Sequence, residues 1–163
     1  FKKNNVESTL IKSVIEFNER RKLNMVKKII NILGKPYKNK KITILGVTFK
    51  PNTDDLRESP SLVIIPKLKK LGIKIYAHDP SYNTTFSSIK EFKGVMWKKN
   101  TFDAVKGSDM IVIHTEWNEY RGMDLSKIKK LLKSPVILDL RNIFNKNELN
   151  EMGYLYYNIG SKK

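Results

Sequence analysis

Short apolar runs alternate with helical patterns along most of this chain, and that alternation most limits what it can fold into. The runs that predict strands lie at residues 42–47, 73–77, 95–97, 110–114, 136–140 and 154–158. Patterns with helical spacing lie between them, at residues 61–71, 102–106 and 125–132 and near Glu148. Strands that alternate with helices through short connections form parallel sheets covered on both faces. The sequence therefore predicts a Rossmann-like α/β domain.

A long amphipathic helix is predicted before the first strand, over residues 6–33. Gly34 followed by Pro36 is a stop signal for its C-terminal end. The helix exceeds what a small sheet needs for cover, so we expect it to connect domains or to mediate oligomerisation. We accordingly divide the chain into the end of a long helix, residues 1–34, and an α/β domain, residues 35–163. Because the chain begins with Phe1, we also expect further sequence upstream.

The composition is strongly basic, with a formal net charge of +16 over 163 residues. A basic nucleic-acid-binding module is one interpretation, because cationic stripes displace counterions from phosphates. The lysines are scattered in short clusters, however, and no helix-turn-helix, zinc-ligand or RNP pattern accompanies them. The charge therefore favours anionic small ligands through steering rather than nucleic acid. Cysteine is absent and only two histidines occur, so we expect no disulfide and no metal site.

The segment GVTFKPNTDDLRESPS, residues 46–61, follows the first predicted strand. In open α/β sheets, ligands bind at such carboxyl ends of strands. A dinucleotide site would carry GxGxxG there, but Gly46 is the only glycine of the segment. Asp79, at the end of the second strand, is either a ribose-binding acid or part of a common Asp-Pro turn. We therefore expect that this domain does not bind NAD by itself.

Four segments in order resemble nucleotide-sugar dehydrogenases of the UDP-glucose/GDP-mannose family. They are FKPNTDDLRESP at residues 49–60, HTEW at residues 114–117, VILDLRN at residues 136–142 and VIEFNE at residues 14–19. Thr53-Asp54-Asp55 and the TEW segment favour the UDP-glucose 6-dehydrogenase type, with GDP-mannose and UDP-N-acetyl-sugar dehydrogenases as alternatives. The resemblance implies that the chain is the carboxy-terminal UDP-binding domain plus the end of a long helix.

The resemblance also implies a set of binding residues. Phe49, Lys50 and Arg141 would hold the uridine nucleotide, and Arg57 would reach the NAD bound mainly by a domain outside this chain. Physically, Lys50 suits a phosphate or ribose oxygen, Arg141 presents a rigid fork toward the same crevice, and Phe49 can offer its backbone or ring near the base. We assign no catalytic residue.

Each of these residues also has a purely structural interpretation. Lys50 could be a solvated surface charge, and Phe49 could belong to the core. Arg57 could pair with the neighbouring Asp54 or Asp55, which we interpret as acceptors that organise the loop. Arg141 could cap a helix or bind Asp139.

The implied reaction oxidises UDP-glucose with two NAD through a cysteine nucleophile, and no cysteine occurs here. We therefore expect the isolated chain to be inactive. We also expect a cytoplasmic protein, a UDP-sugar ligand and a homodimer formed through the long helix.

Overall fold

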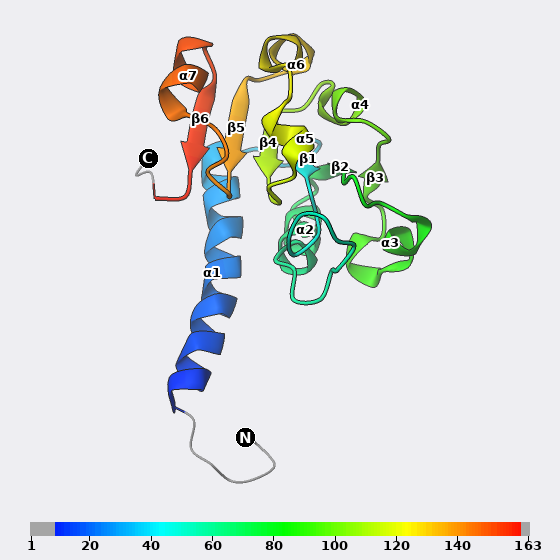
Figure 1. Ribbon diagram of the computed structural model, residues 1–163, viewed down its shortest axis with the longest axis vertical. Helices are drawn as coiled ribbons and strands as arrows, with labels where there is room; N and C mark the ends of the chain where they lie inside the picture. Colours follow the sequence, from blue (N-terminus) through cyan, green and yellow to red (C-terminus); the bar gives the residue numbers. More distant parts are fainter. Residues whose placement is uncertain (1–8, 161–163) are drawn as a thin grey trace.

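The computed structural model describes residues 9–160 and contains one six-stranded sheet (Figure 1). The strands are β1 (Lys41–Leu45), β2 (Lys74–His78), β3 (Met96–Trp97), β4 (Met110–Ile113), β5 (Val136–Asp139) and β6 (Leu155–Asn158). Their order is β3-β2-β1-β4-β5-β6, and every neighbouring pair is parallel. This is the classic order of a doubly wound sheet, which reverses direction between β1 and β4. The predicted Rossmann-like fold is confirmed.

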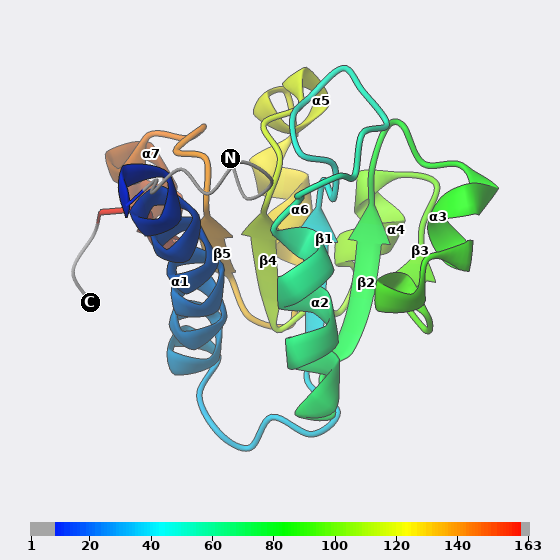
Figure 2. The same cartoon turned by 90° about the horizontal axis from the view of Figure 1, so that it is seen from below.

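Helices cover both faces of the sheet (Figures 1 and 2). They are α1 (Thr9–Leu33), α2 (Ser61–Lys70), α3 (Thr84–Ser88), α4 (Thr101–Val105), α5 (Asn118–Arg121), α6 (Leu125–Leu131) and α7 (Lys146–Glu151), with a 3-10 turn η2 (Lys90–Phe92). Most bounds agree with the predicted ones within one or two residues. The sequence did not predict α3 or α5, which are too short for a periodic apolar pattern to emerge.

Side chains along each strand point alternately to the two faces of the sheet. The protein therefore has two hydrophobic cores, one on each face. On β1, Ile42 and Ile44 face the core shared with α1 and α2, whereas Leu45 faces the core shared with α4 to α7. On β4, Met110 and Val112 face the first core, and Ile111 and Ile113 face the second. Burial on both faces explains why the strands are continuously apolar in sequence.

The long helix α1 packs only its C-terminal half against the sheet. Val26, Ile29 and Leu33 are buried in the first core, while residues 9–21 are exposed and extend beyond the sheet (Figure 1). The helix ends where Gly34 adopts a φ of +67°, as its stop signal predicted. The predicted start at residue 6 lies outside the described residues, and the division at residues 34 and 35 remains a prediction.

Candidate functional site

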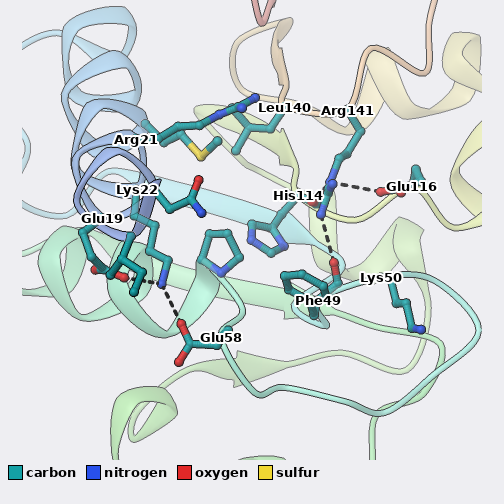
Figure 3. Close-up of a pocket in the computed structure, with 14 residues that line it drawn as sticks. Glu19, Arg21, Lys22, Phe49, Lys50, Glu58, His114, Glu116, Leu140 and Arg141 are labelled. Carbon is teal, nitrogen blue, oxygen red and sulfur yellow. Dashed lines mark hydrogen bonds and ion pairs between the residues drawn. The ribbon is translucent and has the colours of Figure 1, made fainter. Parts of the chain in front are cut away.

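A cavity of about 570 Å³ opens between α1 and the carboxyl ends of β1, β4 and β5. Its lining comes from α1, from the loop after β1, and from the residues that follow β4 and β5 (Figure 3). The lining residues are Ile15, Asn18, Glu19, Arg21, Lys22, Met25, Phe49, Lys50, Glu58, Pro60, His114, Glu116, Leu140 and Arg141. The cavity thus lies at the point where the strand order reverses, the usual ligand position in this class of fold.

Arg141 connects three of the segments that form the cavity. Its Nε donates to the backbone oxygen of His114 at 2.7 Å and lies 3.0 Å from Oε2 of Glu116. Its Nη2 donates to the backbone oxygen of Phe49 at 3.1 Å (Figure 3). The guanidinium therefore stiffens the site, and the carboxylate of Glu116 offsets part of its charge.

The turn after β5 fixes the position of Arg141. Asp139 is fully buried, and its Oδ1 accepts from the backbone N–H of Arg141 at 2.8 Å. Its Oδ2 accepts from the backbone N–H of Ile143 at 2.7 Å, and Asn142 between them has a φ of +55°. The predicted alternative that Arg141 binds Asp139 is therefore present, but through the backbone N–H of Arg141 and not through its guanidinium.

Phe49 and Lys50 both line the cavity, but in different ways. The Phe49 N–H donates to the backbone oxygen of Asp55 at 2.9 Å, and its carbonyl accepts from Arg141. The backbone of Phe49 is therefore engaged, while the residue is 48% exposed. The interpretation of Phe49 as a core residue is wrong. The amino group of Lys50 points away from the guanidinium of Arg141 (Figure 3).

Arg57 does not line the cavity. Its side chain is 89% exposed and forms a two-point contact with Asp55, with Nε to Oδ1 at 3.0 Å and Nη2 to Oδ2 at 2.9 Å. The guanidinium holds the pKa of Asp55 down at about 2. The pairing that the sequence allowed is therefore present, and Asp55 organises the loop as predicted. A contact of Arg57 with NAD remains a prediction.

The cavity residues that the sequence analysis did not assign to the site include Lys22, Glu58 and His114. Lys22 on α1 lies 2.8 Å from Glu19 and 3.3 Å from Glu58, which ties the helix to the loop after β1 (Figure 3). Glu58 adopts a φ of +59°, a region that disfavours its side chain. Helical spacing placed Lys22 on α1 but could not show which loop the helix faces.

His114, the third missed residue, lies at the floor of the cavity just after β4. It is 3% exposed, and its Nδ1 lies 3.1 Å from Oγ1 of Thr115. Its Nε2 has no hydrogen-bond partner among residues 9–160. Burial, with a smaller contribution from the charge of Arg141, lowers its pKa to about 3. A histidine at a strand's carboxyl end was visible in sequence, but its missing partner was not.

The loop after β1 does not fit a dinucleotide. Oδ2 of Asp79 accepts from the backbone N–H of Val47 at 2.7 Å and from that of Thr48 at 3.3 Å, so these donors are not available to a pyrophosphate. A side chain at Gly46 would meet the Cβ of Thr115 at 2.5 Å, so the glycine serves internal packing. Asp79 belongs to a turn that closes this crevice, as one of its two interpretations predicted.

Two other classes of site are not found in the part of the chain that the structure describes. No group of His, Asp and Glu residues there could hold a metal ion. Within residues 9–160, none of the helices combines the length and apolarity that crossing a bilayer requires.

Comparison with known families identifies one match. The UDP-binding domain of the UDP-glucose/GDP-mannose dehydrogenase family matches residues 43–146, a range that contains Phe49, Lys50, Arg57 and Arg141. The resemblance predicted from the four sequence segments is confirmed.

Curated proteins similar to this chain include two UDP-glucose 6-dehydrogenases. One from Rhizobium meliloti (strain 1021) is 36% identical over 151 residues, which cover 93% of this chain and 34% of the relative. TuaD from Bacillus subtilis (strain 168) is 40% identical over 151 residues, which cover 93% of this chain and 32% of the relative. The chain thus spans about a third of the length of these relatives.

Solved structures support the fold. A UDP-D-ManNAc dehydrogenase from Pyrococcus horikoshii superposes with a TM-score of 0.75 at 24% identity, over 96% of this chain and 35% of the other. An NDP-N-acetyl-D-galactosaminuronic acid dehydrogenase from Methanosarcina mazei Go1 gives a TM-score of 0.74 at 27% identity, over 98% of this chain and 33% of the other. Both superpositions include most of α1 together with the sheet, because they cover nearly the whole chain.

Proposed function

The chain belongs to the UDP-glucose/GDP-mannose dehydrogenase family, and we propose that it forms the nucleotide-sugar-binding part of an NAD-dependent UDP-glucose 6-dehydrogenase. The observation that carries the proposal is the cavity where α1 meets the ends of β1, β4 and β5. There Phe49 and Lys50 of one loop line the same cavity as Arg141, which lies 92 positions further along the sequence than Phe49. The similarity to UDP-glucose 6-dehydrogenases supports the choice of substrate.

The binding roles follow from the contacts. The exposed ring of Phe49 offers a flat apolar surface for a base, because its backbone groups are already engaged. Lys50 is a mobile cation at the rim, suited to the diphosphate. Arg141 already contacts Glu116, so we assign it a double role: it holds the cavity's walls together and offers its remaining N–H groups to the nucleotide.

The proposed oxidation requires parts that this chain does not supply. The chain has no cysteine, and the loop after β1 commits its N–H groups to Asp79. We therefore propose that NAD and the nucleophile belong to other parts of the enzyme, and that this chain alone binds UDP-glucose without converting it to UDP-glucuronate. The exposed guanidinium of Arg57 is the group available to face NAD across the cleft.

Calorimetry with the 163-residue chain tests the ligand. We expect UDP-glucose and UDP to bind, and GDP-mannose and GDP to bind more weakly. Tighter binding of the guanine nucleotides would assign the chain to the GDP-mannose branch of the family. Absence of binding to all four would overturn the proposal. Binding of an arbitrary DNA duplex at physiological salt would favour the nucleic-acid alternative instead.

We also propose that α1 mediates a homodimer. Its exposed half carries Leu10, Val14 and Phe17 at helical spacing, and these side chains are 78%, 53% and 58% exposed. Apolar stripes of this kind mark interaction surfaces. Light scattering should give a dimer for the chain and a monomer for the double variant Val14→Glu and Phe17→Glu. A monomer for the unmodified chain at high concentration would contradict the proposal.

A further inference from the structure

A group of lysines lies at the amino edge of the sheet, where the parallel strands begin. The segments at this edge precede β1, β2, β4 and β5 and comprise residues 34–41, 70–74, 106–109 and 130–135. Along the sequence the lysines are scattered, but a parallel sheet brings the starts of its strands to one edge. The cavity lies at the opposite, carboxyl edge.

Backbone hydrogen bonds join these segments to one another. The N–H of Asn39 donates to the oxygen of Gly72 at 3.0 Å, so the segment before β1 lies beside the turn between α2 and β2 (Figure 2). The N–H of Gly107 donates to the oxygen of Leu131 at 2.7 Å, so the segment before β4 lies beside the end of α6. The lysines of these segments therefore belong to one continuous surface.

This surface has an excess of positive charge that its own groups do not balance. Asp109 is the only carboxylate in the four segments. Its Oδ2 accepts from the backbone N–H of Lys41 at 2.8 Å, and its Oδ1 lies 3.1 Å from the amino group of Lys133. Six exposed lysines of these segments have no ion pair among residues 9–160, and we call them the basic edge. They are Lys35, Lys38, Lys70, Lys74, Lys106 and Lys130.

An exposed leucine lies between two lysines of the basic edge. Leu71 follows α2 and is 38% exposed, with Lys70 before it and Lys74 at the start of β2. Binding at a membrane interface grows with the apolar area that is buried and with the electrostatic attraction to anionic lipids. The basic edge offers both contributions in one turn.

The type of cation favours one class of partner. Every cation in the four segments is a lysine, and Tyr37, their only aromatic residue, is half-buried against the first core. Interfaces with other proteins are depleted in lysine and enriched in arginine and aromatic residues. Nucleic acids are bound through arginine forks and stacked aromatic rings. Layers of anionic lipid headgroups, by contrast, attract clusters of lysine point charges and need no fork.

We propose that the basic edge binds the surface of a membrane that contains anionic phospholipids, with its lysines at the headgroups and Leu71 inserted among them. The proposal goes beyond the proposed function and does not depend on it. Because the cavity lies at the carboxyl edge of the sheet, a chain bound in this way keeps the cavity on the side away from the lipid.

Co-sedimentation of the 163-residue chain with lipid vesicles tests the proposal. At physiological ionic strength, vesicles with about 30% phosphatidylserine should bind the chain at least about tenfold more tightly than vesicles of phosphatidylcholine alone. Salt at about 0.5 M should remove most of this difference, because it screens the charges. Equal affinity for the two kinds of vesicle, or no binding to either, would overturn the proposal.

Charge reversal locates the binding surface. Lys70→Glu with Lys74→Glu should weaken binding to the anionic vesicles by about tenfold or more, and Leu71→Gln should weaken it by about twofold to fivefold. The matched control is Lys99→Glu with Lys146→Glu, which changes the net charge equally at exposed lysines that follow β3 and β5. The control should lose less than about threefold. Equal losses in the two double variants would show that only net charge matters, and the proposal would be wrong.

A second double variant, Lys35→Glu with Lys38→Glu, makes the test independent of the folding of the first. It lies in the adjacent segment of the basic edge and should show a similar loss. An excess of an arbitrary DNA duplex should not displace the unmodified chain from the anionic vesicles at physiological ionic strength. Displacement by the duplex would assign the basic edge to nucleic acid and overturn the proposal.

Calorimetry with UDP separates this inference from the proposed function. Both double variants of the basic edge should bind UDP as the unmodified chain does, because the cavity is at the other edge of the sheet. A chain that binds UDP but not the anionic vesicles would overturn the inference and leave the proposed function standing. Binding to the anionic vesicles without binding to UDP would do the reverse.

Discussion

At the carboxyl edge of the sheet, the regions on the two sides of strand β1 differ in how their hydrogen-bonding groups are used. Toward β2, Asp79 takes up the loop's N–H groups through one oxygen and the N–H and hydroxyl of Ser81 through the other. Toward β4 and β5, a cavity remains, and its lining includes His114, whose buried Nε2 has no hydrogen-bond partner among residues 9–160. The first side is closed by the protein's own hydrogen bonds, whereas the second leaves an open cavity.

The difference shows that strand order alone does not make a dinucleotide site. This sheet has the order of dinucleotide-binding domains, but a site also needs unengaged N–H groups at the first loop. Here a buried carboxylate occupies the place where a pyrophosphate would otherwise lie against Val47 and Thr48.

The largest expected effect is on the closed side. Asp79→Ala should reduce the free energy of unfolding by about 4 kcal/mol, because it leaves several buried N–H groups without an acceptor. Urea denaturation followed by circular dichroism measures this change. Asp79→Asn keeps one acceptor oxygen and should cost roughly half as much. A loss below about 1 kcal/mol in Asp79→Ala would mean that water satisfies the loop and that the crevice is not closed as described.

On the open side, the buried imidazole of His114 should make the free energy of unfolding depend on pH. The pKa of His114 is about 3 in the folded chain and 6.5 by default, so the unfolded chain binds more protons between these values. Its contribution to stability is complete above pH 6.5 and is lost as the pH falls toward 3. His78, whose pKa is also lowered by burial, adds to the same trend. His114→Leu should flatten the decline by roughly 2–4 kcal/mol across this window relative to the unmodified chain.

Urea denaturation at pH 7, 5 and 4 measures this difference, and His78→Leu serves as a comparison in which His114 is retained. Equal slopes for His114→Leu and the unmodified chain would show that the ring is hydrated rather than buried. That outcome would also weaken the contrast between the two sides of β1.

The sequence predicted more of the fold than of the contacts in the candidate site. Buried parallel strands are continuous apolar runs, so all six strands were predicted within one or two residues. The location of Phe49, Lys50 and Arg141 around one cavity followed from the rule that strand ends meet at one edge. Local pairing was also accessible, since Arg57 and Asp55 are two residues apart.

The remaining contacts depend on three-dimensional packing. Nothing local indicates that Lys22 of α1 reaches Glu58, because the two are 36 residues apart and α1 could have packed elsewhere along the sheet. Which ring nitrogen of His114 carries the hydrogen depends on where Thr115 donates its hydroxyl proton, and the acceptor is Thr48 in another loop. Hydrogen-bond satisfaction is a property of the assembled site.

On the open side, the next largest effect is expected from substitutions of Arg141. Arg141→Ala should lower the free energy of unfolding by about 1–2 kcal/mol, because it leaves two carbonyls without their donor and removes the ion pair with Glu116. It should also weaken UDP binding by about tenfold or more. Arg141→Lys keeps the charge but lacks the fork, so it should recover only part of either loss. Unchanged UDP affinity in Arg141→Ala, measured by calorimetry, would remove this residue from the binding site.

Replacing Lys50 should weaken nucleotide binding with little effect on stability. Lys50→Ala should change the free energy of unfolding by less than about 0.5 kcal/mol, since the residue is exposed. UDP affinity should fall by roughly threefold to tenfold, because a charged contact to the diphosphate is lost. Lys67→Ala on α2, an exposed lysine outside the cavity lining, is the matched control and should leave affinity unchanged. Equal effects of the two variants would mean that Lys50 acts only through general charge.

The smallest effect concerns Glu58, at the rim where α1 meets the loop after β1. Its φ of +59° strains the backbone, while its carboxylate gains only a largely exposed contact with Lys22. Glu58→Asn and Glu58→Ala both remove that contact, but asparagine tolerates a left-handed backbone far better than alanine. Urea denaturation should therefore find Glu58→Asn more stable than Glu58→Ala by about 0.5–1 kcal/mol. Equal stabilities would mean that the backbone relaxes once the contact is gone, so that Lys22 itself imposes the strained conformation on the open side.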